Sequence, residues 1–176
     1  MYYFCTYFDR NFLYQGLALH ESLREHAGDF ILWVLCFDDT TYNLLNRLKV
    51  PGLCTIHLRD FEAANPGLVT VKKGRSFIEY YWTTTPLLLL YIFNTQPEVD
   101  LLAYLDADLF FYSNVNPIYQ ELGKGSIYII PHRYLVEQTY PQQDCEQMDF
   151  PAGHYNVGYV AFRRDASGLA CLERWA

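Results

Sequence analysis

Continuous apolar runs alternate with amphipathic stretches along the whole chain. Runs such as residues 30–37 have no polar interruption, which is typical of strands covered on both faces. The stretch at residues 11–26 has leucines at helical spacing and stops at Gly28, which predicts a helix. On this pattern we expect strands at 2–8, 30–37, 54–58, 100–105, 126–130 and 155–162. We expect helices at 11–26, after the capping residues 38–41 as far as 48, at 75–93, at 116–122, and after Asp165 to the end.

Alternating strands and helices predict an α/β fold with a mostly parallel sheet flanked by helices. Within the longest predicted helix, Pro86 must either produce a kink or mark the true start. Neither a linker nor a repeat divides the chain, so residues 1–176 are expected to form a single domain. The sequence stops inside an amphipathic helix, and we therefore expect it to be C-terminally incomplete, lacking an acceptor-binding part.

Charge and composition narrow the function classes. Thirteen basic against 20 acidic residues give a net charge of −7, which argues against nucleic acid as the main partner. Only Lys72, Lys73 and Arg75 cluster, and they could hold a small anion. No apolar run approaches the ~20 residues of a transmembrane helix, and no signal peptide is visible. Five widely spaced cysteines argue against a disulfide scaffold and favour a reducing cytoplasm. Cys5 and Cys36 lie in apolar strand runs and are expected to be buried thiols. Peripheral association with a membrane remains an alternative location.

The segment Asp106-Ala107-Asp108 is the sharpest chemical feature. It follows a predicted buried strand, and in extended backbone its two carboxylates share one face, about 7 Å apart at their Cα atoms. Ligands of α/β folds bind at the carboxyl ends of the strands. Two hard oxygen ligands there suit Mg²⁺ or Mn²⁺ carrying the phosphates of a substrate, whereas the alternative is a pair of solvated turn aspartates.

Four segments of the chain together resemble the motifs of a known enzyme family. Asp106-Ala107-Asp108 after an apolar strand is similar to the DxD motif of nucleotide-sugar glycosyltransferases with the Rossmann-like GT-A fold. The segment from Cys5 to Asn11, the strand from Leu32 to Asp39, and the segment Tyr155-Asn156-Val157-Gly158 resemble, in the same order, motifs of family 8 glycosyltransferases and of bacterial nucleotide-diphospho-sugar transferases.

The resemblance implies a metal-dependent transferase that moves a hexose from a nucleotide-diphosphate sugar, with a UDP-sugar expected, to an acceptor hydroxyl on a glycan or other molecule, with retention of configuration. Asp106 and Asp108 would bind Mn²⁺ or Mg²⁺, which neutralises the diphosphate leaving group. The implied nucleotide-sugar contacts are Thr6, Tyr7, Asp9, Lys73, Arg75, Asp106, Ala107, Asn156 and Gly158. Among them, Tyr7 would stack on the base, and Gly158 would let the backbone approach closely beside Asn156.

The chain also departs from the family pattern. The arginine that family 8 enzymes carry before the DxD strand is absent, and we expect either that Lys72, Lys73 or Arg75 replaces its charge or that these residues form a solvated basic turn. The histidine that serves as third metal ligand has no clear counterpart. His20 and His26 are expected at the surface of a helix, whereas His132 and Arg133 are candidate acceptor contacts. No residue is identified as a catalytic nucleophile.

Three alternatives remain. A haloacid dehalogenase phosphatase would use Asp106 as nucleophile, but it requires threonine or valine where this chain has Phe110. A glycosidase would use both carboxylates, although nothing in the sequence indicates a raised pKa for either. A truncated or degenerate domain would act as a nucleotide-sugar-binding or interaction module without catalysis.

Overall fold

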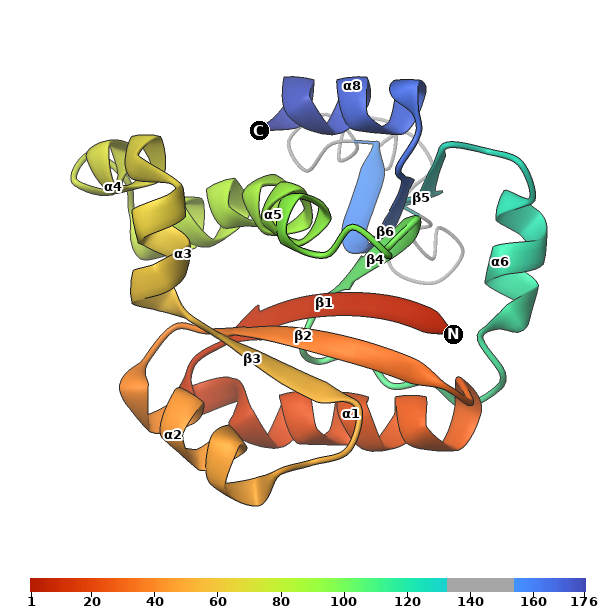
Figure 1. Ribbon diagram of the computed structural model, residues 1–176, viewed down its shortest axis with the longest axis horizontal. Coiled ribbons are helices and arrows are strands. Elements are labelled where there is room, and N and C mark those ends of the chain that lie inside the picture. Colours follow the sequence, from red (N-terminus) through yellow and green to blue (C-terminus); the bar gives the residue numbers. More distant parts are fainter. Residues whose placement is uncertain (133–153) are drawn as a thin grey trace, which may run out of the picture.

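The computed structural model describes residues 1–132 and 154–176, in which six strands form one sheet in the order β3-β2-β1-β4-β6-β5 (Figure 1). The strands β1, β2, β3 and β4 are mutually parallel, and β6 is antiparallel to both β4 and β5. The mostly parallel α/β sheet predicted from the sequence is therefore confirmed. The strands are β1 (Tyr2–Phe8), β2 (Phe30–Cys36), β3 (Leu53–His57), β4 (Leu101–Leu105), β5 (Ile127–Pro131) and β6 (Tyr155–Arg163).

Helices cover both faces of the sheet, as Figure 1 shows. The helices are α1 (Leu13–His26), α2 (Asp39–Leu48), α3 (Leu58–Ala64), α4 (Pro66–Lys72), α5 (Phe77–Thr95), α6 (Asn116–Leu122) and α8 (Ala166–Trp175), with the short 3-10 helix η1 (Arg10–Phe12) after β1. One apolar core packs α1, α2 and α6 against the sheet, and a second packs α3, α4, α5 and α8 against the other face. Successive residues of a strand point to opposite faces, so the central strands β1, β2 and β4 are buried on both.

Helix boundaries follow from capping chemistry. The side chain of Asp38 accepts a hydrogen bond from the backbone N–H of Thr41, and that of Asp165 accepts one from Gly168, so both predicted caps are confirmed. Helix α5 begins at Phe77 because Ser76 and Glu79 form a capping box. Pro86 lies inside this helix, well after its first residue, and so does not mark its start.

Two sequence-based expectations were incomplete or wrong. Helices α3 and α4 fill a stretch to which no element had been assigned. His20 is not a surface residue: it is only 3% exposed, and its Nε2 lies 2.8 Å from the carbonyl oxygen of Pro51. The reason is helical spacing, since Gly16, His20 and Leu23 share the face of α1 that packs on the sheet. His26 is partly exposed.

Within the described residues, no helix combines the length and the apolar character needed to cross a bilayer. The longest of them, α5, owes its apolar sequence to burial against the sheet, where Leu88, Leu89 and Ile92 are fully buried.

Candidate functional site

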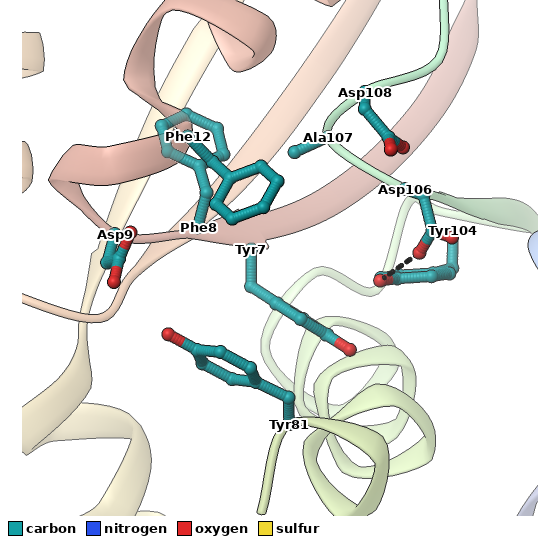
Figure 2. A pocket seen from close by; sticks show the side chains of 9 residues that line it. All are labelled: Tyr7, Phe8, Asp9, Phe12, Tyr81, Tyr104, Asp106, Ala107 and Asp108. Carbon is teal, nitrogen blue, oxygen red and sulfur yellow. Dashed lines mark hydrogen bonds between the residues drawn. The ribbon is translucent and has the colours of Figure 1, made fainter. Parts of the chain in front are cut away.

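A cavity of about 210 Å³ opens at the carboxyl ends of β1 and β4, between the two halves of the sheet (Figure 2). From β1 the chain continues to β2 on one side, while β4 pairs with β1 on the other, so this is the point where the strand order reverses. Its lining combines carboxylates with aromatic rings: Tyr7, Phe8, Asp9, Phe12, Tyr81, Tyr104, Asp106, Ala107 and Asp108. The cavity therefore lies where open α/β sheets bind their ligands.

The two carboxylates of the predicted metal motif are placed by the end of β4. This strand is buried along almost its whole length, and the chain turns as soon as it leaves the sheet, with the Leu109 N–H donating to the carbonyl of Asp106 at 3.1 Å. The Asp106 N–H donates to the carbonyl of Gly158 in β6 at 2.8 Å. Asp106 is consequently half-buried and fixed, whereas Asp108 is exposed at the cavity (Figure 2).

The surroundings of the Asp106 carboxyl group raise its pKa above the ordinary value for aspartate. Burial raises its pKa, the hydrogen bond that the Tyr104 hydroxyl donates to Asp106 Oδ1 at 2.8 Å lowers it in part, and the charge of Asp108 raises it further. No pattern in the sequence indicates this pKa shift, because it depends on burial. A divalent cation beside both carboxylates would offset this unfavourable pairing of charges.

The donor set fits Mg²⁺ or Mn²⁺. Two carboxylates provide only part of an octahedral oxygen shell, and Mg²⁺ commonly takes the rest from substrate phosphates and water. Across residues 1–132 and 154–176, no group of three or more histidine, cysteine or acidic side chains is arranged to hold a metal alone. The remaining positions around a cation bound by these two carboxylates would be open to other ligands, such as phosphates and water.

Aromatic rings form the other wall of the cavity. The ring of Tyr7 stacks on that of Tyr81 with centroids 5.6 Å apart and planes 20° apart, and it lies 5.3 Å from that of Tyr104. Its hydroxyl is hydrogen-bonded to Thr85 Oγ1 at 3.0 Å, so the ring of Tyr7 is held on several sides. Phe12, which is 48% exposed, contributes an open ring at the same cavity.

The loop after β1 positions Phe12. Asp9 caps η1, its carboxylate accepting from the backbone N–H of Asn11 at 2.8 Å and from the Asn11 side chain at 3.0 Å. The backbone N–H of Arg10 donates to Asp38 Oδ2 at 2.8 Å, which ties this loop to the end of β2. Asp9 lines the cavity, and it also sets the turn that brings Phe12 to the rim.

Asn156 and Gly158 stand beside the cavity rather than in its lining. Asn156 Oδ1 accepts from the Gly158 N–H at 2.6 Å. A Cβ added to Gly158 would lie 2.9 Å from Asn156 Oδ1 and 3.1 Å from Asp106 Oδ2. The close backbone approach expected at Gly158 is thus an approach to the Asp106 carboxylate.

Other predicted site residues lie away from this cavity. Thr6 is fully buried, and its hydroxyl has no hydrogen-bond partner among the described residues. Lys73 is exposed at the end of α4, and Arg75 lines a separate hollow with Glu79 and Trp82. His132 follows β5, where its backbone N–H donates to the carbonyl of His154 at 3.0 Å. Arg133 lies outside the described residues.

Sequence reasoning missed four aromatic residues of the lining, namely Phe8, Phe12, Tyr81 and Tyr104. A signal existed for Tyr104, since it lies two positions before Asp106 and extended backbone directs both side chains to one face. For Tyr81 there was none, because its place depends on how α5 packs across the sheet.

Comparisons with known proteins give relatives of greater length. No family model matches the chain. It is similar to the uncharacterized proteins YfnF and YfnD of Bacillus subtilis (strain 168), with 31% identity over 172 residues and 33% over 175. These matches cover 98% and 99% of this chain but 56% and 53% of the relatives. The chain thus spans about half the length of the curated relatives that it matches.

Solved structures share the fold at low identity. Mouse xyloside xylosyltransferase 1 matches with a TM-score of 0.62 and 13% identity, over 99% of this chain and 73% of that one. The galactosyltransferase LgtC, in complex with donor and acceptor sugar analogs, gives 0.57 and 16%, over 98% and 58%. A CMP:2-keto-3-deoxy-manno-octonic acid synthetase complexed with CTP gives 0.51 and 12%, over 98% and 76%. The chain therefore has the mixed α/β fold of GT-A glycosyltransferases, as predicted.

Proposed function

We propose that this chain is the nucleotide-sugar-binding part of a metal-dependent glycosyltransferase that transfers a hexose to an acceptor hydroxyl. One observation carries the proposal: the Asp106 and Asp108 carboxylates share a cavity with an aromatic wall at the switch point of the sheet. Carboxylates suit a cation that binds a diphosphate, and aromatic rings suit the flat face of a base. The fold alone does not identify the activity, since a structure with a similar fold is that of a synthetase.

Several residues in and beside the cavity have a defined task in this proposal. Phe12 offers its exposed ring to the nucleobase, and Tyr7 and Tyr81 form the wall behind it. Asp106 and Asp108 hold Mn²⁺ or Mg²⁺, which when bound acts as a Lewis acid on the departing diphosphate. Gly158 lets the Asp106 carboxylate lie close to β6, beside the expected position of the donor sugar. The resemblance to family 8 enzymes favours a UDP-sugar and retention of configuration.

Calorimetry tests the proposal directly. The wild-type chain is titrated with UDP, UDP-glucose, UDP-galactose and GDP-mannose, with and without Mn²⁺. We expect Mn²⁺-dependent binding of at least one ligand, lost in Asp108→Ala. Asp60→Ala, which removes an exposed carboxylate on α3, is the matched control and should bind as the wild type does. Absence of nucleotide binding under every condition would refute the proposal.

Product assays separate the competing activities. Release of free sugar or its transfer from the donor supports a transferase, and NMR of the anomeric proton in the product reports retention or inversion. Tight, metal-dependent binding without turnover would instead favour the non-catalytic module. Pyrophosphate release from a nucleoside triphosphate and a sugar would indicate a synthetase.

A further inference from the structure

Tyr104 and Asp106 form a hydrogen-bonded pair at the end of β4. They are two residues apart in extended chain, so both side chains leave the same face of the sheet. The Tyr104 hydroxyl donates to Asp106 Oδ1 at 2.8 Å, as the dashed line in Figure 2 marks. Tyr104 is only 2% exposed, so its side of this part-buried hydrogen bond is shielded from water, and the bond is stronger than one at the surface.

Packing leaves the Tyr104 side chain little freedom. β4 lies between β1 and β6, and the ring of Tyr104 is 5.3 Å from that of Tyr7. Tyr7 is tied in turn to Thr85 on α5 by a hydrogen bond of 3.0 Å. A functional side chain is positioned well when the residues that hold it have locked rotamers themselves, and Tyr104 meets that condition.

The second oxygen of Asp106 is also constrained. The position that a Cβ of Gly158 would take is 3.1 Å from Asp106 Oδ2, and the backbone of Asp106 is bonded to the same glycine. The carboxylate is therefore held at Oδ1 by Tyr104 and bordered at Oδ2 by β6. Asp108, by contrast, is exposed.

We infer that Tyr104 is a positioning residue whose hydroxyl fixes the Asp106 carboxylate for the divalent cation. The inference rests on the proposed function, since it concerns the same site. Carboxylates that ligate metals are commonly oriented by hydrogen bonds from neighbouring groups, and loss of such a partner typically costs about 10–100-fold in metal affinity. Tyr104 acts through Asp106 and needs no contact with the metal.

The test compares two tyrosine-to-phenylalanine substitutions. Tyr104→Phe removes the hydroxyl and keeps the ring. Tyr128→Phe is the matched control, because its hydroxyl donates to the Glu121 carboxylate at 2.9 Å, away from the cavity. Mn²⁺ affinity in the presence of UDP is measured by electron paramagnetic resonance of the free ion. We expect a loss of about 10–100-fold for Tyr104→Phe and less than twofold for Tyr128→Phe.

Two further measurements isolate the role of the hydroxyl. Metal-free binding of UDP should be unchanged in Tyr104→Phe, because the ring still lines the cavity. In an Asp106→Ala background, Tyr104→Phe should cause no additional loss of Mn²⁺ affinity, as expected for two residues that act as one unit. Melting temperatures of all variants report whether the fold is retained.

The outcomes are distinguishable. Unchanged Mn²⁺ affinity in Tyr104→Phe would overturn the inference and leave the proposed function intact. Equal losses of metal-free and metal-dependent UDP binding would also overturn it, because Tyr104 would then act only as part of the wall. Wild-type protein without any Mn²⁺-dependent binding would overturn both.

Discussion

The backbone N–H of Asp106 donates to the carbonyl of Gly158 at 2.8 Å, so the first carboxylate of the motif is bonded to a strand about fifty residues further along the chain. The same glycine allows the Asp106 side chain to lie against β6, since a Cβ there would come within 3.1 Å of Oδ2. The position of Asp106 thus depends on β6 as much as on β4.

A methyl group at Gly158 should disturb the metal site. In Gly158→Ala the new Cβ meets Asn156 Oδ1 at 2.9 Å and Asp106 Oδ2 at 3.1 Å, and one of these side chains must move. We expect Mn²⁺ affinity in the presence of UDP to fall about tenfold, because the new methyl group disturbs the packing that orients the Asp106 carboxylate. Calorimetry measures the change.

Gly67→Ala is the control for that substitution. Nothing lies within 4 Å of the Cβ that it adds in α4, so stability should stay the same or rise by up to about 1 kcal/mol, with unchanged metal affinity. Equal metal affinity in Gly158→Ala and Gly67→Ala would show that Gly158 has no part in the site.

The exposed ring of Phe12 should contribute to nucleotide binding. Stacking of a base on an aromatic side chain is worth about 1–3 kcal/mol, so Phe12→Ala should weaken UDP binding by about 5–160-fold. Tyr14→Ala removes a ring that is 83% exposed on α1 and is not part of the lining, and it should bind as the wild type does. If both variants retain full affinity in calorimetry, Phe12 is not the base platform.

Removal of the Asp106 charge should stabilise the apo protein. Its pKa is raised chiefly by burial, so the folded state binds a proton more readily than the unfolded state, and ionisation lowers stability as the pH rises through the folded-state pKa. Asp106→Asn should therefore raise the melting temperature by about 1–3 °C near neutral pH. The gain should shrink on acidification, where the wild-type carboxyl is protonated as well. A melting temperature lowered at neutral pH, or a gain that grows in acid, would contradict this reading.

Close packing beneath the cavity gives a separate prediction. A Cβ on Gly16 would lie 2.3 Å from Cε1 of Phe8, whose ring is almost fully buried and lines the cavity. Overpacking of this kind costs about 1–3 kcal/mol, so Gly16→Ala should lower the melting temperature by about 2–10 °C. Calorimetry compares the melting temperatures of Gly16→Ala and Gly67→Ala. Equal values would mean that the Phe8 ring can move aside without a loss of stability.

The sequence was most informative where structure is local. Apolar runs located the strands, and Asp38 and Asp165 marked helix starts, because a cap depends on residues only three positions apart. Asp106 and Asp108 were identified because a buried strand must end at the edge of the sheet. The hydrogen bond between the Asp106 backbone and Gly158, and the half-burial of Asp106, are tertiary features that left no local pattern in the sequence.

Tertiary packing also explains the errors. A histidine on an amphipathic helix is normally assigned to the surface, yet His20 is buried because it finds a backbone carbonyl at Pro51. Lys73 and Arg75 were assigned to the donor site as substitutes for the absent family arginine, but α4 and the start of α5 place them outside the lining. The charge of a side chain alone does not indicate where that side chain lies in the folded structure.

The pairing of β4 with β6 has a consequence for the order of events during synthesis. Asp106 leaves the ribosome well before Gly158, and its backbone N–H can be satisfied in the native way only when β6 has emerged and inserted between β4 and β5. Contacts between residues so far apart in the sequence form late, because the entropy lost in closing the intervening segment is offset only once those contacts are made. A nascent chain halted before β6 would carry both aspartates and the aromatic wall, yet it would lack the strand that holds Asp106. Competence to bind a cation should therefore appear abruptly, near the end of translation of this segment.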